Sequence, residues 1–293
     1  GRFDRRVVLD LPDMEGRKAI LKIHINGKPI SKDVDWDKVS RRTVGFSGAD
    51  LENMLNEAAI LAARRDGKEL DMKDIEEAAT KVKLGPEKKR LQTDLDRKMT
   101  AYHEAGHAIV AHEMPNMDPV HRISIVSRGM ALGFTLIPPQ KDRIHETKTH
   151  LLEQIISMLG GRAAEELIFD EMTSGASNDI DKATMVAREM VVEFGMSSLG
   201  PINFGPTTDV MEWGGRYYNE PQISPDMQNK IDHQVKSIID ECYKKAEFIL
   251  KKLKNKLDVV AEELIRKETL EGDEFEKLMG HPKPAIAPVK LKV

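Results

Sequence analysis

The chain has 293 residues, enough for two domains, and its 49 acidic and 45 basic side chains give a net charge of -4. This balance excludes the basic surface expected of a nucleic-acid-binding protein, and the 32% of charged residues indicate well-solvated surfaces. A single cysteine, Cys242, excludes an intramolecular disulfide framework and favours reducing surroundings. The sequence also lacks an apolar run of about 18 residues, so it predicts no membrane-spanning helix.

The first 84 residues predict a small helical domain. A short strand is expected at Val7-Val8-Leu9, ended by Pro12-Asp13. Four helices are expected after it, over residues 13–25, 35–42, 47–65 and 71–83. The third of them has Ser47 as its predicted N-cap and apolar residues spaced i, i+3, i+4 and i+7 behind it.

Two short motifs in this part resemble AAA ATPases. Gly1-Arg2-Phe3-Asp4-Arg5 resembles the end of the second region of homology of that family, and residues 45–51 resemble the start of a helix in its C-terminal lid. The resemblance implies that Arg2 and Arg5 reach the nucleotide of the neighbouring subunit, where guanidinium groups stabilise phosphoryl charge. It also implies that Gly48 and Ala49 border the adenine site. The alternatives are two exposed cations on a loop and an ordinary capped helix.

The sequence contains no G-x-x-x-x-G-K-[ST] motif, and therefore no P-loop lysine. We expect that the chain does not hydrolyse ATP alone, and that ATP and Mg²⁺ belong to a longer protein of which this is a fragment. After the four helices, a Gly-Pro breaker and a basic run make residues 85–92 the predicted linker between two domains.

The segment His103-Glu104-Ala105-Gly106-His107 predicts a hydrolytic zinc site. At 3.6 residues per turn the two histidines lie on one helix face, close enough to bind one ion. Glu104 is placed to take a proton from a water that zinc has acidified. The alternative is a helix whose two histidines are only surface or core residues.

The surrounding sequence favours a metal site in the middle of a helix. Thr93 and Asp96 resemble a capping box, and Pro115 ends the helical pattern. Small residues on this helix would let another backbone pack closely against it; they are Ala105, Gly106, Ala108 and Ala111.

Two histidines leave zinc short of the three protein ligands that catalytic sites use. A metzincin would need Gly at 110 and His at 113, but the sequence has Val110 and Glu113. A third ligand must therefore come from elsewhere. The candidates are Glu165, Glu166, Asp179, Asp181, His112 and His121.

Three motifs in one order resemble the peptidase domain of FtsH, the membrane-anchored ATP-dependent zinc metalloprotease family. They are Tyr-His-Glu-Ala-Gly-His (102–107), Gly-Gly-Arg-Ala-Ala-Glu-Glu (160–166) and Ser-Gly-Ala-Ser-Asn-Asp-Ile (174–180). The resemblance implies that Asp179 is the third zinc ligand and that Glu165 lies close to the site. Carboxylates near a metal commonly orient its histidine ligands, so we expect this role for Glu165 rather than direct binding; the alternative is an exposed helix carboxylate. With the AAA motifs, it covers almost the whole chain.

Strand patterns follow the motif helix. Residues 122–126 and 131–136 alternate as two strands around a turn at Arg128-Gly129. An edge strand near the zinc could hold an extended substrate by main-chain hydrogen bonds, and the family resemblance implies that the second strand does so.

The remaining sequence predicts mostly helices. They are expected at 147–168, interrupted by Gly160-Gly161, at 180–194, from Ser224 to about Asn255, and at 256–268. Asp179 would lie at a helix N-terminus, where the helix dipole favours the ionised form that binds metals. Residues 195–222 predict a long irregular loop, and Cys242 is expected to be a packed core residue rather than a nucleophile.

Together these features predict a mainly α-helical chain: an AAA lid bundle, then a mostly helical HExxH zinc peptidase domain with a small β element. The expected ranges are the end of an AAA core at 1–12, a lid at 13–84, a linker at 85–92, a peptidase domain at 93–280 and a disordered tail at 281–293.

The predicted function is zinc-dependent hydrolysis of unfolded or membrane-extracted proteins that an ATPase ring delivers. By the family resemblance, the expected partners are a homo-hexamer and a membrane, the latter bound through anchors absent from this sequence, with no nucleic acid. The full-length protein would face the bacterial cytoplasm from the inner membrane, or lie in an organellar membrane, and the fragment itself would be soluble. The alternatives are an assembly module without turnover and an ATP-independent peptidase of unstructured peptides.

Overall fold

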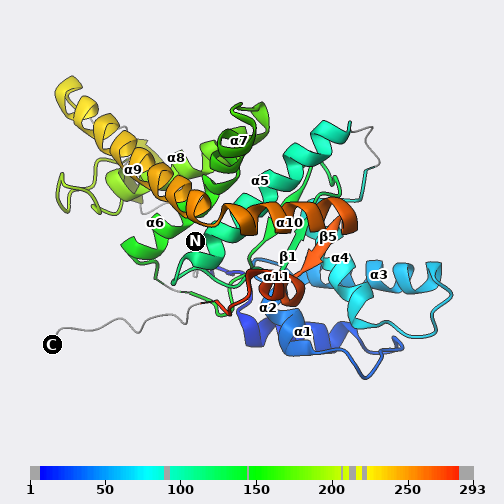
Figure 1. The fold of residues 1–293 in the computed structure, drawn as a ribbon. Helices are drawn as coiled ribbons and strands as arrows, with labels where there is room; N and C mark the ends of the chain where they lie inside the picture. Colours follow the sequence, from blue (N-terminus) through cyan, green and yellow to red (C-terminus); the bar gives the residue numbers. More distant parts are fainter. Residues whose placement is uncertain are drawn as a thin grey trace, which may run out of the picture. The chain divides into compact units, whose positions relative to one another are not determined.

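The structure is a computed structural model that describes residues 7–88, 93–143, 145–205, 207–210, 216–219 and 223–283. The chain is mainly helical, as predicted, and it forms two compact units (Figure 1). One unit comprises the first 91 residues together with residues 126–132 and 137–144, and the other comprises the rest of the chain. Among the described helices, none combines the length and the apolar character needed to cross a bilayer.

The first unit contains the four predicted helices, which are α1 (Met14–His24), α2 (Trp36–Arg42), α3 (Gly48–Arg64) and α4 (Met72–Leu84). Ser47 caps α3 as predicted, because its hydroxyl accepts from the Asp50 N–H while the Asp50 carboxylate accepts from the Ser47 N–H. The helices enclose one apolar core, in which Leu51, Met54 and Leu55 of α3 are fully buried.

The prediction of a strand at Val7-Val8-Leu9 was wrong. These residues belong to no strand, and their side chains are 71–91% exposed. A β-pattern forms a strand only where a neighbouring strand takes up its main-chain hydrogen bonds, and the described residues of the first unit offer none here.

The second unit is built around α5 (Asp94–Glu113), which packs against α7 (Gly160–Phe169) and α10 (Lys254–Lys267). Thr93 and Asp96 form the predicted capping box, and α5 ends just before Pro115. Nearly every side chain from Thr100 to His112 is buried, so the middle of this helix lies in the core of the unit. The remaining helices are α6 (Lys148–Met158), α8 (Ser177–Val192), α9 (Pro225–Lys252) and α11 (Gly272–Met279).

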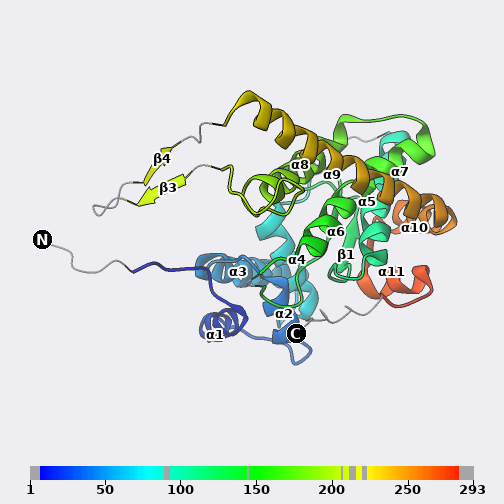
Figure 2. The same ribbon diagram turned by 90° about the vertical axis from the view of Figure 1, so that its left-hand side faces the viewer.

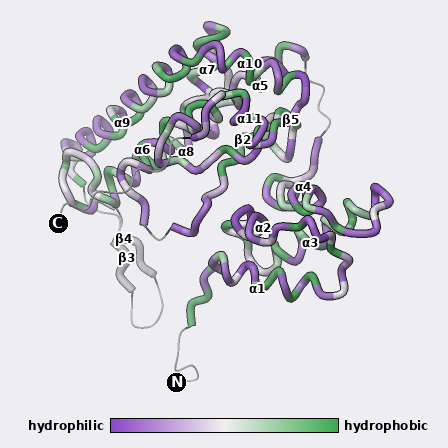
Figure 3. The backbone as a smooth tube through the Cα atoms, turned by 60° about the horizontal axis from the view of Figure 1, so that its bottom comes forward, coloured by the Kyte–Doolittle hydropathy of each residue, from purple (hydrophilic) through white to green (hydrophobic). Residues whose placement is uncertain are grey.

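Helix α9 begins as the sequence predicted, with Ser224 as N-cap and Pro225 as first residue. Hydrophobic and hydrophilic residues alternate along it (Figure 3), and its buried stripe includes Cys242 and Ala246. Cys242 is a packed residue, as expected, whereas His233 on the same helix is exposed. Burial raises the pKa of the Cys242 thiol to about 11, so the thiol stays protonated at neutral pH.

A small antiparallel sheet has the strand order β2 (Phe134–Leu136), β1 (Arg122–Ser124), β5 (Thr269–Glu271). The first two strands were predicted, and they pair with Ile123 opposite Thr135. The third was not predicted, because its three residues are too few to show an alternating pattern between two helices. In the described sheet β2 is therefore an edge strand.

The prediction of an irregular loop over residues 195–222 was partly wrong. Strands β3 (Thr207–Val210) and β4 (Arg216–Asn219) pair there as an antiparallel hairpin, which Figure 2 shows beyond the helices. The threonines and tyrosines of these segments favour strands, and this signal was outweighed by the surrounding Gly-Pro and Gly-Gly pairs. The predicted tail begins with residues 281–283, which are placed in the structure, and residues 284–293 lie outside the described part.

Candidate metal centre and active site

One turn of α5 brings the imidazoles of His103 and His107 together, with their Nε2 atoms 3.0 Å apart. Asp179, in the first turn of α8, places Oδ2 3.3 Å from Nε2 of His103 and 3.4 Å from Nε2 of His107. A tetrahedral zinc ion with bonds of about 2.05 Å holds its ligand atoms about 3.3 Å apart. The three donor atoms therefore have the chemistry and the spacing of a zinc site.

The other ring nitrogen of each histidine is also occupied. Nδ1 of His103 donates to Oε1 of Glu165 at 2.7 Å, and Nδ1 of His107 donates to the main-chain oxygen of Ser157 at 2.7 Å. Because a carboxylate and a carbonyl can only accept, these bonds fix the proton on Nδ1. They leave the Nε2 lone pairs facing the shared centre, which is how histidines are oriented toward a metal.

Glu165 is itself held in place. It is only 2% exposed, and its Oε2 accepts a hydrogen bond from the Thr173 main-chain N–H at 3.1 Å. The Thr173 hydroxyl lies 3.1 Å from the same oxygen. The carboxylate thus reaches His103 from a rigid position and is not one of the three clustered donors.

The charges of the cluster depend strongly on one another. Burial disfavours the charged form of His103, but its hydrogen bonds to Asp179 and Glu165 outweigh this and raise its pKa to about 10. Burial likewise disfavours the Asp179 carboxylate, yet the hydrogen bonds from both histidines hold its pKa well below the usual range. A metal ion binds the neutral imidazoles and the ionised carboxylate, so it would compete with the proton that these hydrogen bonds favour.

Glycines make room for this arrangement. A Cβ atom on Gly161 would lie 2.6 Å from Nε2 of both His103 and His107, so only glycine fits there. Gly106 and Gly160 lie equally close, since a Cβ on Gly106 would be 2.5 Å from the Gly160 oxygen. The predicted close approach of another backbone to α5 is therefore confirmed, and α7 supplies it.

Glu104 projects toward the edge strand β2. The Thr135 hydroxyl lies 2.7 Å from Oε2 of Glu104 and 3.0 Å from its main-chain oxygen. A Cβ on Gly133 would lie 2.9 Å from the Glu104 side chain, so the strand passes directly against this carboxylate. Burial raises the pKa of Glu104, against the lowering effect of His103 and His107. This is the environment expected of a general base.

The structure separates the remaining candidates for the third ligand from the cluster. Glu166 accepts a hydrogen bond from the Tyr243 hydroxyl, and Asp181 is exposed on α8. His121 is not part of the cluster, and His112 lies in a different group of side chains with Glu113. Of the six candidates, only Asp179 meets both histidines.

Two of the four predicted nucleotide residues are described by the structure. Arg2 and Arg5 lie outside the described residues. Gly48 and Ala49 form the first turn of α3 in the first unit, partly exposed. The sequence did not predict that Thr135, Ser157 and Thr173 contact the site, because single hydroxyl residues and a main-chain oxygen form no sequence pattern.

Comparison with known proteins gives two family matches. Residues 90–278 match peptidase family M41, and residues 33–77 match the AAA+ lid domain. The chain is 48% identical over 286 residues to the "ATP-dependent zinc metalloprotease FtsH 1" of Sphaerobacter thermophilus, covering 97% of this chain and 44% of that protein.

Two further relatives carry the name "ATP-dependent zinc metalloprotease FtsH". That of Pseudothermotoga lettingae is 50% identical over 282 residues, covering 95% of this chain and 45% of the relative. That of Thermotoga maritima is 46% identical over 283 residues, covering 96% and 46%. The chain spans about half the length of the curated relatives it matches.

Proposed function

The chain belongs to peptidase family M41, the FtsH-type zinc metalloproteases, and on that premise we propose that it is a zinc-dependent endopeptidase that cleaves unfolded polypeptides. One observation carries the proposal: His103, His107 and Asp179 direct three donor atoms to one point beside the buried carboxylate of Glu104. We propose these three residues as the zinc ligands and Glu165 as the residue that orients His103.

The residues of the site suit the successive steps of peptide-bond hydrolysis. A zinc ion bound here would supply Lewis-acid polarisation of the scissile carbonyl and would make a water more acidic. The Glu104 carboxylate takes the proton of the attacking water and then delivers it to the leaving amine. Thr135 fixes one carboxylate oxygen of Glu104, so that the other is free to face the substrate. The raised pKa of Glu104 brings its proton affinity closer to the neutral range.

The substrate would lie along β2. This strand pairs on one side with β1 and contacts Glu104 through Thr135, and Gly133, just before the strand, also lies against Glu104. An extended peptide added to its other edge would receive main-chain hydrogen bonds and would pass the proposed zinc site. Because main-chain pairing is independent of side chains, this mode suits a protease that accepts many sequences.

The finer assignments rest on the relatives, which are longer than this chain. By its relatives, we propose that the chain works in a homo-hexameric, membrane-anchored, ATP-dependent machine that feeds unfolded or membrane-extracted proteins to the zinc site. In that assembly Arg2 and Arg5 would reach the nucleotide of the neighbouring subunit, and Gly48 and Ala49 would border the adenine. The proposed domain division keeps a lid at 13–84 and a peptidase domain at 93–280, consistent with the two family matches.

Cleavage of an unstructured fluorogenic polypeptide without ATP tests the proposal. We expect the intact chain to cleave it, and a chelator to abolish cleavage until zinc is restored. Glu104→Gln should keep its zinc but cleave about 10² to 10⁴ times more slowly, the usual contribution of a general base. Glu166→Gln, a change of the same kind outside the cluster, is the matched control. If the intact chain holds zinc but is inert, the alternative of an assembly module without turnover is correct.

A further inference from the structure

A second group of metal-binding side chains lies at the C-terminal end of α5. One ligand atom each from His112, Glu113 and His281 lie within 4.8 Å of one another. Oε1 of Glu113 lies 3.3 Å from Nε2 of His281, the separation of two ligands on a tetrahedral zinc ion, about 3.3 Å. The rings of His112 and His281 lie close together, with centroids 5.1 Å apart and planes tilted by 48°.

One of these atoms lacks a partner. Nε2 of His112 is buried and makes no hydrogen bond within the described residues. Oε1 of Glu113 is also buried and makes no hydrogen bond there, but it lies next to Nε2 of His281. His112 is only 1% exposed, and its ring packs edge-on against Phe275. A buried polar atom without a partner costs free energy, so such atoms usually serve a bound water, an ion or a catalytic step.

The segment that carries His281 is fixed to the end of α5. Nζ of Lys283 donates to the main-chain oxygens of Ala111, His112 and Met114, the last at 2.9 Å. These are carbonyl groups at a helix C-terminus, which attract a cation. His281 therefore stays next to His112, although the two residues are far apart in sequence.

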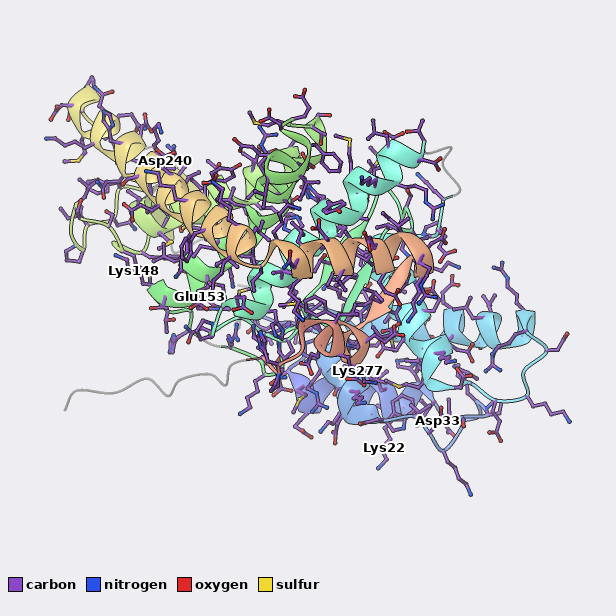
Figure 4. The ribbon with its side chains drawn as sticks, in the orientation of Figure 1. Lys22, Asp33, Lys148, Glu153, Asp240 and Lys277 are labelled. Atoms are coloured by element: carbon purple, nitrogen blue, oxygen red, sulfur yellow. The ribbon has the colours of Figure 1, made fainter. Side chains whose placement is uncertain are left out.

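The surrounding charges favour a further cation. Four carboxylates act on the Lys283 ammonium group, those of Glu153, Asp118, Glu113 and Glu276. Glu153 lies on α6 and is labelled in Figure 4. The negative charges that act on this ammonium group favour a cation near the end of α5.

We propose that His112, Glu113 and His281 form a second zinc site, which ties the segment after α11 to the end of the active-site helix. Two imidazoles and one carboxylate are the donor set that zinc and similar borderline divalent metals prefer, whereas Mg²⁺ and Ca²⁺ prefer oxygen ligands alone. His281 is half-exposed and lines an open surface hollow, so an ion can reach it from solvent. The other residues of the hollow are Asp273, Glu276, Lys277, Gly280 and Pro282.

Zinc content per chain tests this proposal independently of catalysis. The full chain is stripped with a chelator, reloaded with Zn²⁺ and freed of excess ion, and its zinc is then counted by mass spectrometry. We expect two equivalents in the wild type and one in His281→Ala. Because His281 is exposed, its replacement should not disturb folding, which circular dichroism checks. The matched control is His233→Ala, another exposed histidine outside both clusters.

A second variant assigns each equivalent to a site. In Asp179→Asn we expect the equivalent of the first cluster to be lost and the other to remain, and Co²⁺ loading of this variant should give a visible absorption band that His281→Ala removes. One equivalent in the wild type, unchanged in His281→Ala, would overturn the second site and leave the proposed peptidase intact. A second equivalent that survives both His281→Ala and His112→Gln would overturn it as well.

Discussion

Helix α5 carries a histidine and a glutamate side by side twice, as His103-Glu104 in its middle and as His112-Glu113 at its end. In the middle, both imidazoles are held by hydrogen bonds to Glu165 and to the Ser157 oxygen. At the end, His112 has an Nε2 without a hydrogen bond, and His281 is half-exposed.

The two clusters differ in how far their donor atoms are held in position before an ion binds. The middle cluster holds its donor atoms in position before an ion arrives, so binding costs little ordering of side chains. At the end cluster, Lys283 fixes the main chain near His281, but the half-exposed imidazole of His281 must be ordered when the ion binds. We therefore expect the middle cluster to keep zinc through longer dialysis than the end cluster does.

Replacing Asp179 should have the largest effect on the difference in zinc affinity between the two clusters. Asp179→Asn removes one of three proposed ligands and its negative charge, so zinc affinity of the middle cluster should fall by more than about 100-fold, the upper limit usual for residues that only orient ligands. Glu166→Gln should change it little, since Glu166 contacts Tyr243. Competition with a chromophoric chelator measures both, and equal affinities in the two variants would refute Asp179 as a ligand.

Gly161→Ala tests the rigidity of the middle cluster. Its Cβ would lie 2.6 Å from both Nε2 atoms, so the histidine rings or α7 must move. We expect a loss of about 1–3 kcal/mol in the free energy of unfolding, the usual cost of overpacking a core, together with weaker zinc binding. The control is Gly48→Ala, where a Cβ meets its first neighbour only at 4.0 Å. Unchanged stability and zinc binding in Gly161→Ala would show that the cluster adapts.

Glu165→Gln sharpens the comparison, because it makes the middle cluster more like the end cluster. The amide oxygen can still accept from His103, but the negative charge that makes the imidazole a better ligand is gone. Zinc affinity should fall about 10- to 100-fold, less than in Asp179→Asn. Chelator competition ranks the two variants, and the reverse order would make Glu165 the ligand and Asp179 the orienting residue.

The middle of α5 could be predicted from sequence because the residues that define it are close together in the chain. The spacing of His103 and His107, the cap at Thr93 and the stop before Pro115 all depend on residues within one helix. The helix starts at Ser47 and Ser224 were predicted for the same reason.

The partners of that helix could not be predicted from local patterns. Glu165 and His103 are 62 residues apart, and only the family motifs suggested that they meet. Ser124 of β1 contacts Thr269 of β5 across 145 residues, and nothing in either segment specifies this pairing. The end cluster likewise depends on where the segment after α11 returns, so the sequence suggested His112 only as a ligand for the wrong site.

Lys283→Met tests which interaction holds the segment after α11 to the end of α5. Its effect on stability should be the smallest of those predicted. At pH 7 we expect a loss of about 0.5–1.5 kcal/mol in the free energy of unfolding, since the carbonyls at the helix end lose their hydrogen-bond donor. Burial lowers the pKa of Lys283 from 10.5 to about 8, so between these values the unfolded chain binds the additional proton.

The wild type should therefore gain stability relative to Lys283→Met as the pH rises from about 8 toward 10.5, because the neutral amine is cheaper to bury and still donates hydrogen bonds. Urea unfolding at pH 7 and pH 9.5 measures this, with the exposed Lys277→Met as control (Figure 4). A difference that shrinks with pH would mean that the charge of Lys283, rather than its hydrogen bonds, holds the segment. The ammonium group would then be the main link between His281 and the active-site helix.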